Sequence, residues 1–250
     1  MNITLENVSV NAEKKSIISS VSTLIPSEKT TVIIGENGSG KSTLLKAVSA
    51  LTPLASGKVF YGDTPLEKIS TKELAKIRAA VMQNPPVPFG LRVKELLHLA
   101  RYARNSSSAA DTAAIEKAAE ICKCGKFIDR RAETLSGGEM RRVYLALALA
   151  QEPEILFLDE AEANTDAAFH AEFPALLQTL KPRTVVMVTH DLDLALQCAD
   201  RIIGMKSGNL EFAADSDADD LQEILSRFTN GKWKFFRDEN GLLRALPFYS

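Results

Sequence analysis

A glycine-rich segment near the N-terminus has the clearest chemical pattern in the sequence. Residues 35–43, GENGSGKST, satisfy G-x-x-x-x-G-K-[ST] and lie between a strand expected at 29–34 and a helix expected from Lys41. Such glycines let backbone N–H groups point inward, and the following helix adds its positive end. The lysine of this pattern bridges β- and γ-phosphates, and the hydroxyl after it binds Mg²⁺. The segment therefore predicts a nucleotide site. The expected contact residues are Gly35, Glu36, Asn37, Gly38, Ser39, Gly40, Lys41, Ser42 and Thr43.

An acidic pair closes a later apolar strand, whose sequence is ILFLDE. Asp159 ends the strand and Glu160 follows it, facing the other way. Asp159 is placed to support a Mg²⁺ ion, and Glu160 could polarise a water for attack on a γ-phosphate. Taken alone, the pair could also be a solvated strand end. The phosphate loop upstream favours the catalytic interpretation.

A histidine follows another apolar strand, whose sequence is TVVMVT. His190 lies between that strand and Asp191, at the edge where parallel sheets bind ligands. It could donate a hydrogen bond to the γ-phosphate. For an isolated histidine at this position, a capping or core role is the favoured interpretation. His98 and His170 lie within expected helices and are interpreted as structural.

The elements that must position these residues alternate between strands and helices, which indicates a parallel α/β sheet. Apolar runs at 155–158 and 185–188 suit strands that are buried on both faces. Between 93 and 126, Ala, Leu, Lys, Glu and Arg at helical spacing predict an all-helical insert with a break at 106–108. Strands are expected at 3–10, 17–25, 29–34, 57–61, 79–83, 154–159 and 184–189, and other helices at 41–51, 71–77, 138–151, 167–180 and 192–199.

Composition excludes several classes of protein. The 250 residues are 45% hydrophobic and 25% charged, which argues against disorder, a collagen-like repeat and a disulfide scaffold. The formal charge of -2 offers no global field for nucleic acid. Cys122 and Cys124 form a Cys-x-Cys pair that no second pair completes, so reduced thiols are expected. No secretory signal is visible, and the longest apolar run, at 143–150, is shorter than the ~20 residues that span a bilayer.

A further motif gives the chain a specific resemblance. The segment LSGGE, from Leu135 to Glu139, matches the signature motif of the ABC-type ATPases, and it lies between the phosphate loop and the acidic pair, as in that family. Gln83 lies where the family has its lid glutamine, and His190 lies where it has its switch histidine. Asp166 matches the aspartate that ends the loop after the catalytic glutamate. The chain resembles this family over nearly its whole length.

The resemblance implies a P-loop NTPase fold of ABC type. This is an α/β fold with a mainly parallel core sheet, an N-terminal antiparallel β-subdomain and an inserted all-helical subdomain, here at about 88–136, followed by a short C-terminal extension at about 221–250. It also implies an ATPase that works as a homodimer, in which each signature closes on the ATP of the other copy. The implied catalytic residues are Lys41, Gln83, Glu160 and His190; those near Mg²⁺ are Ser42, Gln83 and Asp159; those of the signature are Ser136, Gly137, Gly138 and Glu139, with Asp166 in the dimer loop.

The sequence departs from the family in two places. The aromatic residue that stacks on adenine should fall near Ala12, yet neither Ala12 nor its neighbours Asn11 and Glu13 are aromatic. Weaker recognition of the base is therefore expected. The loop AEANTD has Glu162 and Asn164 where the family has a proline, small hydroxyl residues and a leucine. These two residues could alter communication between the copies of a dimer.

Softer similarities concern the biological role. The segments GLRVKELLHLARYAR and LALAQEP and the tail from Phe228 to Pro247 resemble the importers of iron chelates, haem and cobalamin. This implies uptake of a metal chelate, with polytopic permease subunits, a substrate-binding protein, ATP and Mg²⁺ as partners, and a peripheral place on the cytoplasmic face of the inner membrane. No nucleic acid partner is expected. The alternatives are an ABC ATPase of another importer class and a soluble ABC ATPase without a transport role.

The segment after the lid glutamine could contact the permease. Its apolar residues either line a groove for a helix of the permease or belong to ordinary core packing, and the sequence leaves both interpretations open. These residues are Val87, Phe89, Leu91 and Val93.

Overall fold

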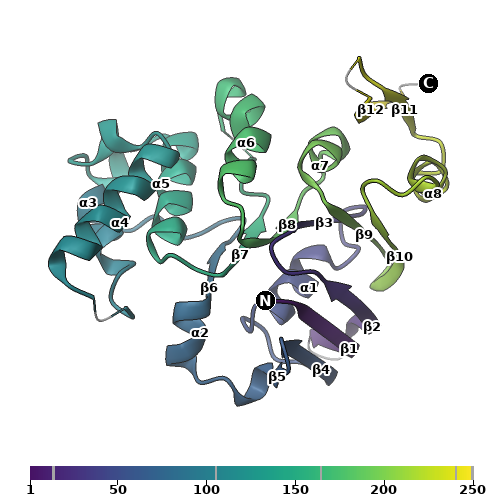
Figure 1. Cartoon of the computed structure of the whole chain (residues 1–250), viewed down its shortest axis with the longest axis horizontal. Helices are drawn as coiled ribbons and strands as arrows, with labels where there is room; N and C mark the ends of the chain where they lie inside the picture. The colour runs from purple at the N-terminus through teal and green to yellow at the C-terminus, as the bar shows by residue number, and fades with distance from the viewer. Residues whose placement is uncertain (13–14, 105, 164, 240, 249–250) are drawn as a thin grey trace. The chain divides into compact units, whose positions relative to one another are not determined.

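The computed structural model of the chain describes residues 1–12, 15–104, 106–163, 165–239 and 241–248 (Figure 1). The chain divides into two compact units. The first unit comprises Met1–Lys68 and Leu180–Ser250, and the second comprises Ile69–Thr179. No helix within the described ranges has the length and apolar character that crossing a membrane requires.

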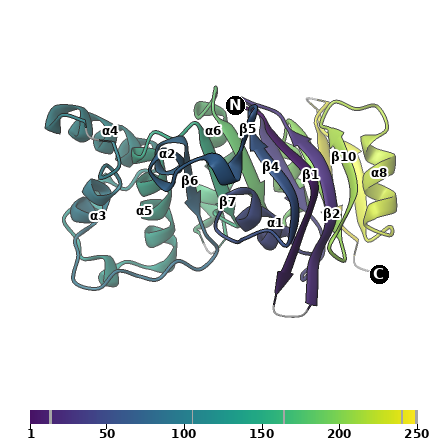
Figure 2. The ribbon, with the colours of Figure 1, turned by 90° about the horizontal axis from the view of Figure 1, so that it is seen from below.

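The first unit contains an antiparallel sheet with strand order β2-β1-β4-β5 (Figure 2). Strand β1 (Ile3–Ala12) buries Ile3, Leu5, Val8 and Val10, and the residues between them are mostly more exposed. This one-sided burial is typical of an antiparallel sheet that covers a core with one face. The antiparallel N-terminal subdomain is therefore present as expected. The other strands of this sheet are β2 (Lys15–Ile25), β4 (Ser56–Tyr61) and β5 (Thr64–Pro65).

The same unit contains a parallel set of strands. Strand β3 (Thr30–Ile34) runs parallel to β8 (Thr184–Val188) and β9 (Arg201–Lys206), whereas β10 (Asn209–Asp215) turns back antiparallel to β9. Every residue of β3 and β8 is buried, which is typical of strands covered on both faces. Helix α1 (Lys41–Val48) packs on β8, and helix α7 (Leu192–Cys198) packs on β3. The short 3₁₀ turn η1 (Leu66–Lys68) contacts β4 of the antiparallel sheet.

The C-terminal extension is a helix followed by a hairpin. Helix α8 (Leu221–Phe228) buries Leu221 and Leu225, and β11 (Trp233–Arg237) pairs antiparallel with β12 (Leu243–Pro247). The hairpin packs beside α7. Neither this hairpin nor strands β9 and β10 were among the elements expected from the sequence.

The second unit combines a parallel strand pair with a helical cluster. Strand β6 (Arg78–Val81) runs parallel to β7 (Ile155–Asp159), and α5 (Gly137–Ala150) packs on β6. The expected helical insert is present as α3 (Val93–Leu99) and α4 (Ser108–Ile121), both packed on α5 (Figure 1). The remaining elements are α2 (Thr71–Ile77), η2 (Gly125–Phe127), η3 (Ala132–Thr134) and α6 (Ala167–Thr179).

The cysteines are reduced, as the sequence predicts. Cys122, Cys124 and Cys198 are buried and form no disulfide. Burial raises the pKa of the Cys124 thiol to about 11, so this thiol stays protonated and unreactive at neutral pH.

Candidate nucleotide site

The glycine-rich loop connects β3 to α1, as the sequence predicts. Gly35 has φ +152°, and a Cβ at this position would lie 2.2 Å from the carbonyl oxygen of Met205, so only glycine fits. Lys41 Nζ donates to the carbonyl oxygens of Gly35 at 2.8 Å and Glu36 at 3.0 Å. The ammonium group therefore lies over the start of the loop, where a phosphate chain would run.

Helix α1 begins without a side-chain cap. Gly40 is its N-cap residue, with φ +98°, and it has no side chain to accept from the N–H groups of the first turn. These N–H groups and the helix dipole attract an anion. The hydroxyl of Ser39 is buried and has no hydrogen-bond partner among the described residues. The Ser39 hydroxyl and the positive end of α1 are therefore suited to bind a phosphate group.

His190 lies at the same edge of the strand pair as this loop. Strands β3 and β8 are in parallel register with Ile33 opposite Val188, so the segments that follow them leave at one edge. The side chain of His190 is exposed there. Asp191 accepts from the backbone N–H of Leu194 at 3.0 Å and so caps helix α7. The histidine is thus fixed between a buried strand and a capped helix.

The second unit brings the lid glutamine to the acidic pair. Strand β6 ends at Val81, two residues before the expected end at 83, so Gln83 lies beyond the strand. Val81 is opposite Leu158 on β7, and Gln83 Nε2 donates to Glu160 Oε2 at 2.6 Å. Asp159 is only 1% exposed at the end of β7. Gln83 and Glu160, which are distant in the sequence and were predicted separately, are therefore hydrogen-bonded through their side chains within this unit.

The signature motif forms the start of helix α5. Ser136 Oγ accepts from the N–H of Glu139, and Glu139 Oε2 accepts from the N–H of Ser136, which makes a capping box. The bond from the Ser136 N–H lowers the pKa of the Glu139 carboxyl, and Arg130 also contributes to that shift. Helix α5 begins at Gly137, one residue before the expected start at Gly138.

An arginine on this helix holds the lid glutamine segment. Arg141 is 7% exposed and donates to the carbonyl oxygens of Met82, at 2.8 Å, and Gln83. Burial lowers the pKa of Arg141, and the carboxylates of Glu162 and Glu160 oppose that shift. The helix that begins with the signature is therefore bonded directly to the backbone of Gln83.

Asp166 contacts the same helix from the loop after β7. Its Oδ2 accepts from Arg142 at 2.7 Å, and its Oδ1 accepts from the N–H of Phe169 at 2.9 Å. The guanidinium of Arg142 lies 4.1 Å from the centre of the Phe169 ring. Glu162 is buried in this loop, and Asn164 lies outside the described residues.

The predicted residues therefore fall into two sets, one in each unit. The first unit holds the phosphate loop and His190, and the second holds the lid glutamine, the acidic pair, the signature and Asp166. Residues 18–163, more than half of the chain, match the family described as ABC transporter. The chain belongs to the ABC transporter family.

Curated relatives support this assignment to the ABC transporter family over most of the chain. The iron(3+)-hydroxamate import ATP-binding protein of Bacillus subtilis (strain 168) is 35% identical over 215 residues, which are 83% of this chain and 80% of the relative. The hemin import ATP-binding protein of Rhodococcus jostii (strain RHA1) is 34% identical over 228 residues, 89% of this chain and 77% of the relative.

Solved ABC cassettes have the same fold. A dimeric ATP-binding cassette in a post-hydrolysis state, bound to ADP and Pi, has a TM-score of 0.78 and 25% identity. The match covers 86% of this chain and 99% of that cassette. The predictions of an ABC-type α/β fold, ATP binding and membership of an ATPase family are therefore confirmed.

One departure from the ABC pattern persists in the structure. Asn11 and Ala12 end strand β1 with exposed side chains, and neither offers a ring for adenine. Glu13 lies outside the described residues. Weak recognition of the base by this segment stays a prediction.

The segment after the lid glutamine is divided between surface and core. Val87 is 54% exposed and Phe89 is 87% exposed, whereas Val93 is fully buried in α3. Leu91 is half-buried. Of the two interpretations left open by the sequence, core packing holds for Val93, and a docking surface is compatible with Val87 and Phe89.

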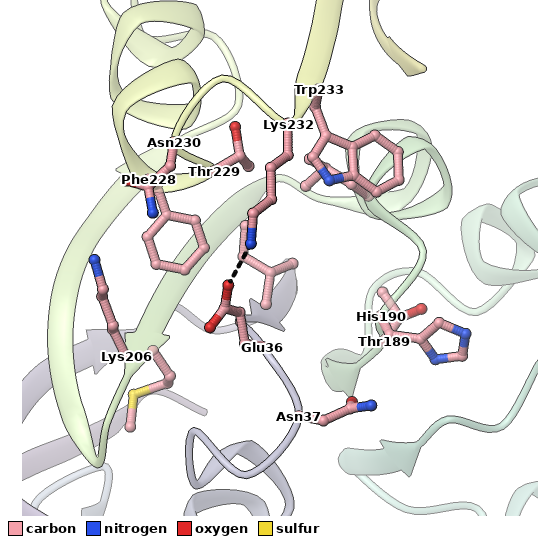
Figure 3. A pocket seen from close by; sticks show the side chains of 14 residues that line it. Glu36, Asn37, Thr189, His190, Lys206, Phe228, Thr229, Asn230, Lys232 and Trp233 are labelled. Atoms are coloured by element: carbon pink, nitrogen blue, oxygen red, sulfur yellow. Dashed lines mark hydrogen bonds and ion pairs between the residues drawn. The ribbon is translucent and has the colours of Figure 1, made fainter. Parts of the chain in front are cut away.

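Sequence reasoning missed three polar residues of this ABC ATPase. Arg141 and Arg142 follow the signature, and an arginine on a helix that is otherwise buried signals that acceptors lie nearby, so their contacts could have been sought. Lys232 had no such signal. It reaches Glu36 of the phosphate loop from the C-terminal extension, and no motif precedes or follows it (Figure 3).

Proposed function

We propose that this chain is the ATP-hydrolysing subunit of an importer that takes up a metal chelate of the iron-siderophore, haem or cobalamin type. The similarity to siderophore and hemin import ATP-binding proteins, at 33–36% identity over more than four fifths of the chain, supports this proposal most strongly. An importer of another class and a soluble ABC ATPase are the alternatives that the experiment below separates.

The phosphate loop binds the triphosphate of ATP. Lys41 bridges the β- and γ-phosphates from its place over the loop, and the N–H groups at the start of α1 bind the phosphate oxygens. Asn37 and His190 line one pocket at this loop, so His190 can donate to the γ-phosphate. These residues neutralise the negative charge that the reaction redistributes.

Hydrolysis uses the acidic residue beyond β7 as the base. Glu160 accepts a proton from a water molecule, whose oxygen attacks the γ-phosphorus. The bond from that phosphorus to the oxygen bridging to the β-phosphate breaks, which yields ADP and phosphate. Gln83 donates to Glu160 Oε2 and thereby orients the carboxylate. Arg141 fixes the backbone of Gln83, so the orientation extends to the signature helix.

The resemblance to the ABC ATPases implies a Mg²⁺ ion, and the chemistry of the expected ligands suits it. Ser42 offers a hydroxyl, Asp159 a carboxylate and Gln83 an amide oxygen, all hard ligands of the kind that Mg²⁺ prefers. Gln83 Nε2 donates to Glu160, so Oε1 is the atom of this amide that could bind a cation. When bound with ATP, the ion supplies positive charge to the phosphates.

Two copies of the chain complete each site. Ser136, Gly137 and Gly138 present the N-terminus of α5, and in a head-to-tail homodimer this end binds the ATP held by the other copy. Asp166 lies beside this helix through Arg142 and belongs to the same dimer surface. ATP binding closes the pair, and hydrolysis opens it.

The permease partner binds the surface that includes Val87 and Phe89. Val87 and Phe89 are large exposed apolar side chains two residues apart, which favours a protein contact here. The chain thus lies peripherally on the cytoplasmic face of the inner membrane, held there by polytopic permease subunits. A substrate-binding protein delivers the chelate to that permease.

Affinity purification from the native host tests the transport role. A tagged chain is recovered from detergent-solubilised membranes, and its partners are identified by mass spectrometry. A polytopic permease of the metal-chelate class at matching stoichiometry is the expected result. A permease of another class, or only soluble ribosomal or DNA-repair partners, would contradict the proposal.

A matched pair of variants identifies the docking surface. Phe89→Asp should lose the permease and keep ATP hydrolysis. Leu51→Asp, at a side chain that is 47% exposed in the first unit, should keep both. If Phe89→Asp still recovers the permease, the surface that includes Val87 and Phe89 is not the docking site.

A further inference from the structure

The C-terminal extension reaches the phosphate loop. Lys232, between α8 and β11, places its Nζ 3.2 Å from Glu36 Oε1. In Figure 3 the lysine extends down to Glu36, with the ring of Phe228 on one side and that of Trp233 on the other. These residues line a pocket of about 290 Å³ together with Asn37 and His190. The extension therefore forms a wall of the pocket beside the phosphate loop.

Two contacts hold the extension in this place. The ring of Phe228 packs edge-on against Phe212 of β10, with centroids 5.1 Å apart. Arg244 of β12 donates to both carboxylate oxygens of Asp193, at 2.9 and 2.6 Å, and the N–H of Ala245 donates to the same carboxylate. Because Lys232 lies between these two anchors, its backbone is held near the loop.

The negative charge of Glu36 makes its contact with Lys232 relevant to nucleotide binding. The residue lies in a loop that must bind a triphosphate, and an uncompensated carboxylate there repels the ligand. The backbone carbonyl of the same residue accepts from Lys41. Lys232 neutralises the Glu36 carboxylate. The same contact restrains Glu36, whose carbonyl oxygen accepts the hydrogen bond from Lys41.

We propose that Lys232 is a positioning residue of the nucleotide site: it neutralises and holds Glu36, and it thereby increases the affinity of the phosphate loop for ATP. This makes the C-terminal extension part of the ATP site. The inference rests on the proposed binding of ATP by this loop. Both partners are exposed, with side-chain accessibilities of 67% and 74%, so the effect on affinity is moderate and sensitive to salt.

A double-mutant cycle tests the role of Lys232. The variants are Lys232→Met, Glu36→Gln and the double variant, with Lys234→Met as the control because Lys234 is an exposed lysine on the same segment. Calorimetric titration with ATP in the absence of Mg²⁺ gives the affinity without turnover. Steady-state hydrolysis then gives KM and kcat separately.

The expected result is a charge rescue. Lys232→Met should weaken ATP binding about two- to fivefold at low ionic strength, with a matching rise in KM and a kcat within about twofold of wild type. Glu36→Gln should bind ATP at least as tightly as wild type, because no repelling carboxylate remains beside the phosphates. The double variant should bind ATP about as tightly as wild type, because both charges of the pair are gone. The loss should shrink in ~0.5 M NaCl, and Lys234→Met should behave like wild type.

Three results would overturn the proposal. In the first, Lys232→Met binds ATP with the same affinity as Lys234→Met. In the second, the double variant binds ATP as weakly as Lys232→Met. A rise in ATP affinity or kcat on loss of the lysine would show an inhibitory contact instead. Failure of wild type to bind or hydrolyse ATP would contradict the proposed function itself, so the two failures are distinguishable.

Discussion

The side-chain amide of Gln83 donates a hydrogen bond of 2.6 Å to the carboxylate of Glu160. The two residues follow neighbouring parallel strands, β6 and β7, whose carboxyl ends lie at one edge. Arg141 binds the carbonyl oxygen of Gln83 from the signature helix. A movement of that helix is therefore transmitted by two hydrogen bonds to the residue that we propose as the catalytic base.

Removal of this hydrogen bond should impair hydrolysis more than binding. Gln83→Leu should lower kcat about 10- to 100-fold because the Glu160 carboxylate loses its orienting donor, whereas the affinity for ATP should change less than about threefold. Steady-state kinetics and calorimetric titration measure the two quantities. An unchanged kcat would show that Gln83 does not position the base.

Asp166 should contribute to the stability of a single chain apart from any role in a dimer. Asp166→Ala removes both the hydrogen bond to the Phe169 N–H at the start of α6 and the pair with Arg142, and it should lower the free energy of unfolding measured in urea titrations. Asp166→Asn keeps an acceptor for the N–H of Phe169 and should lose less than half of that amount. Equal losses in the two variants would contradict the capping role.

Trp233 should report nucleotide binding. It is the single tryptophan of the chain, and it lines the pocket with His190 and Asn37. ATP at the loop changes the polarity around the indole, so the intensity or wavelength of its emission should change on titration and saturate at one site per chain. A Lys41→Ala variant should show no such change, because the phosphates lose their main cation. The same emission change in that variant would indicate binding elsewhere.

Docking of the C-terminal hairpin should weaken in acid. Burial alone would raise the pKa of Asp193, but the bonds from Arg244 and the Ala245 N–H outweigh it and lower that pKa below its usual range. A carboxyl whose pKa is lower in the folded state adds stability above its unfolded pKa, about 4, and this stability is lost as the pH falls through the folded value.

Proteolysis and Trp233 emission can follow this docking. Between pH 7 and pH 5 the hairpin should stay bound, and its docking should begin to weaken only below about pH 4, as the Asp193 carboxylate takes up a proton. Arg244→Met should loosen the hairpin at neutral pH and flatten the acid dependence. An acid profile identical to wild type in this variant would exclude the Asp193–Arg244 pair as its cause.

Local pattern and strand topology made much of the fold predictable. Helix α2 begins and ends at the predicted residues, because Ser70 and Glu73 form a capping box that can be read directly in the sequence. The fully apolar strands β7 and β8 were equally clear, and the residues that follow parallel strands at one edge could be expected to meet.

Other features depend on contacts between distant parts of the chain. The approach of Arg141 to the backbone of Gln83 cannot be read from the spacing of either residue, since the two are joined only after α5 packs on β6. The C-terminal hairpin has short strands with apolar residues on both faces, so its alternation is weak. The contact of Lys232 with Glu36 spans almost the whole chain and follows from the docking of that hairpin.

The most direct test of the account is the Glu160→Gln variant, compared with wild type in ATP turnover and in sedimentation with ATP. Loss of the carboxylate removes the base and keeps the shape of the site. The account predicts that turnover falls about 100-fold or more and that ATP holds two copies together as a stable dimer. Hydrolysis at the wild-type rate, or a variant that stays monomeric with saturating ATP, would contradict it.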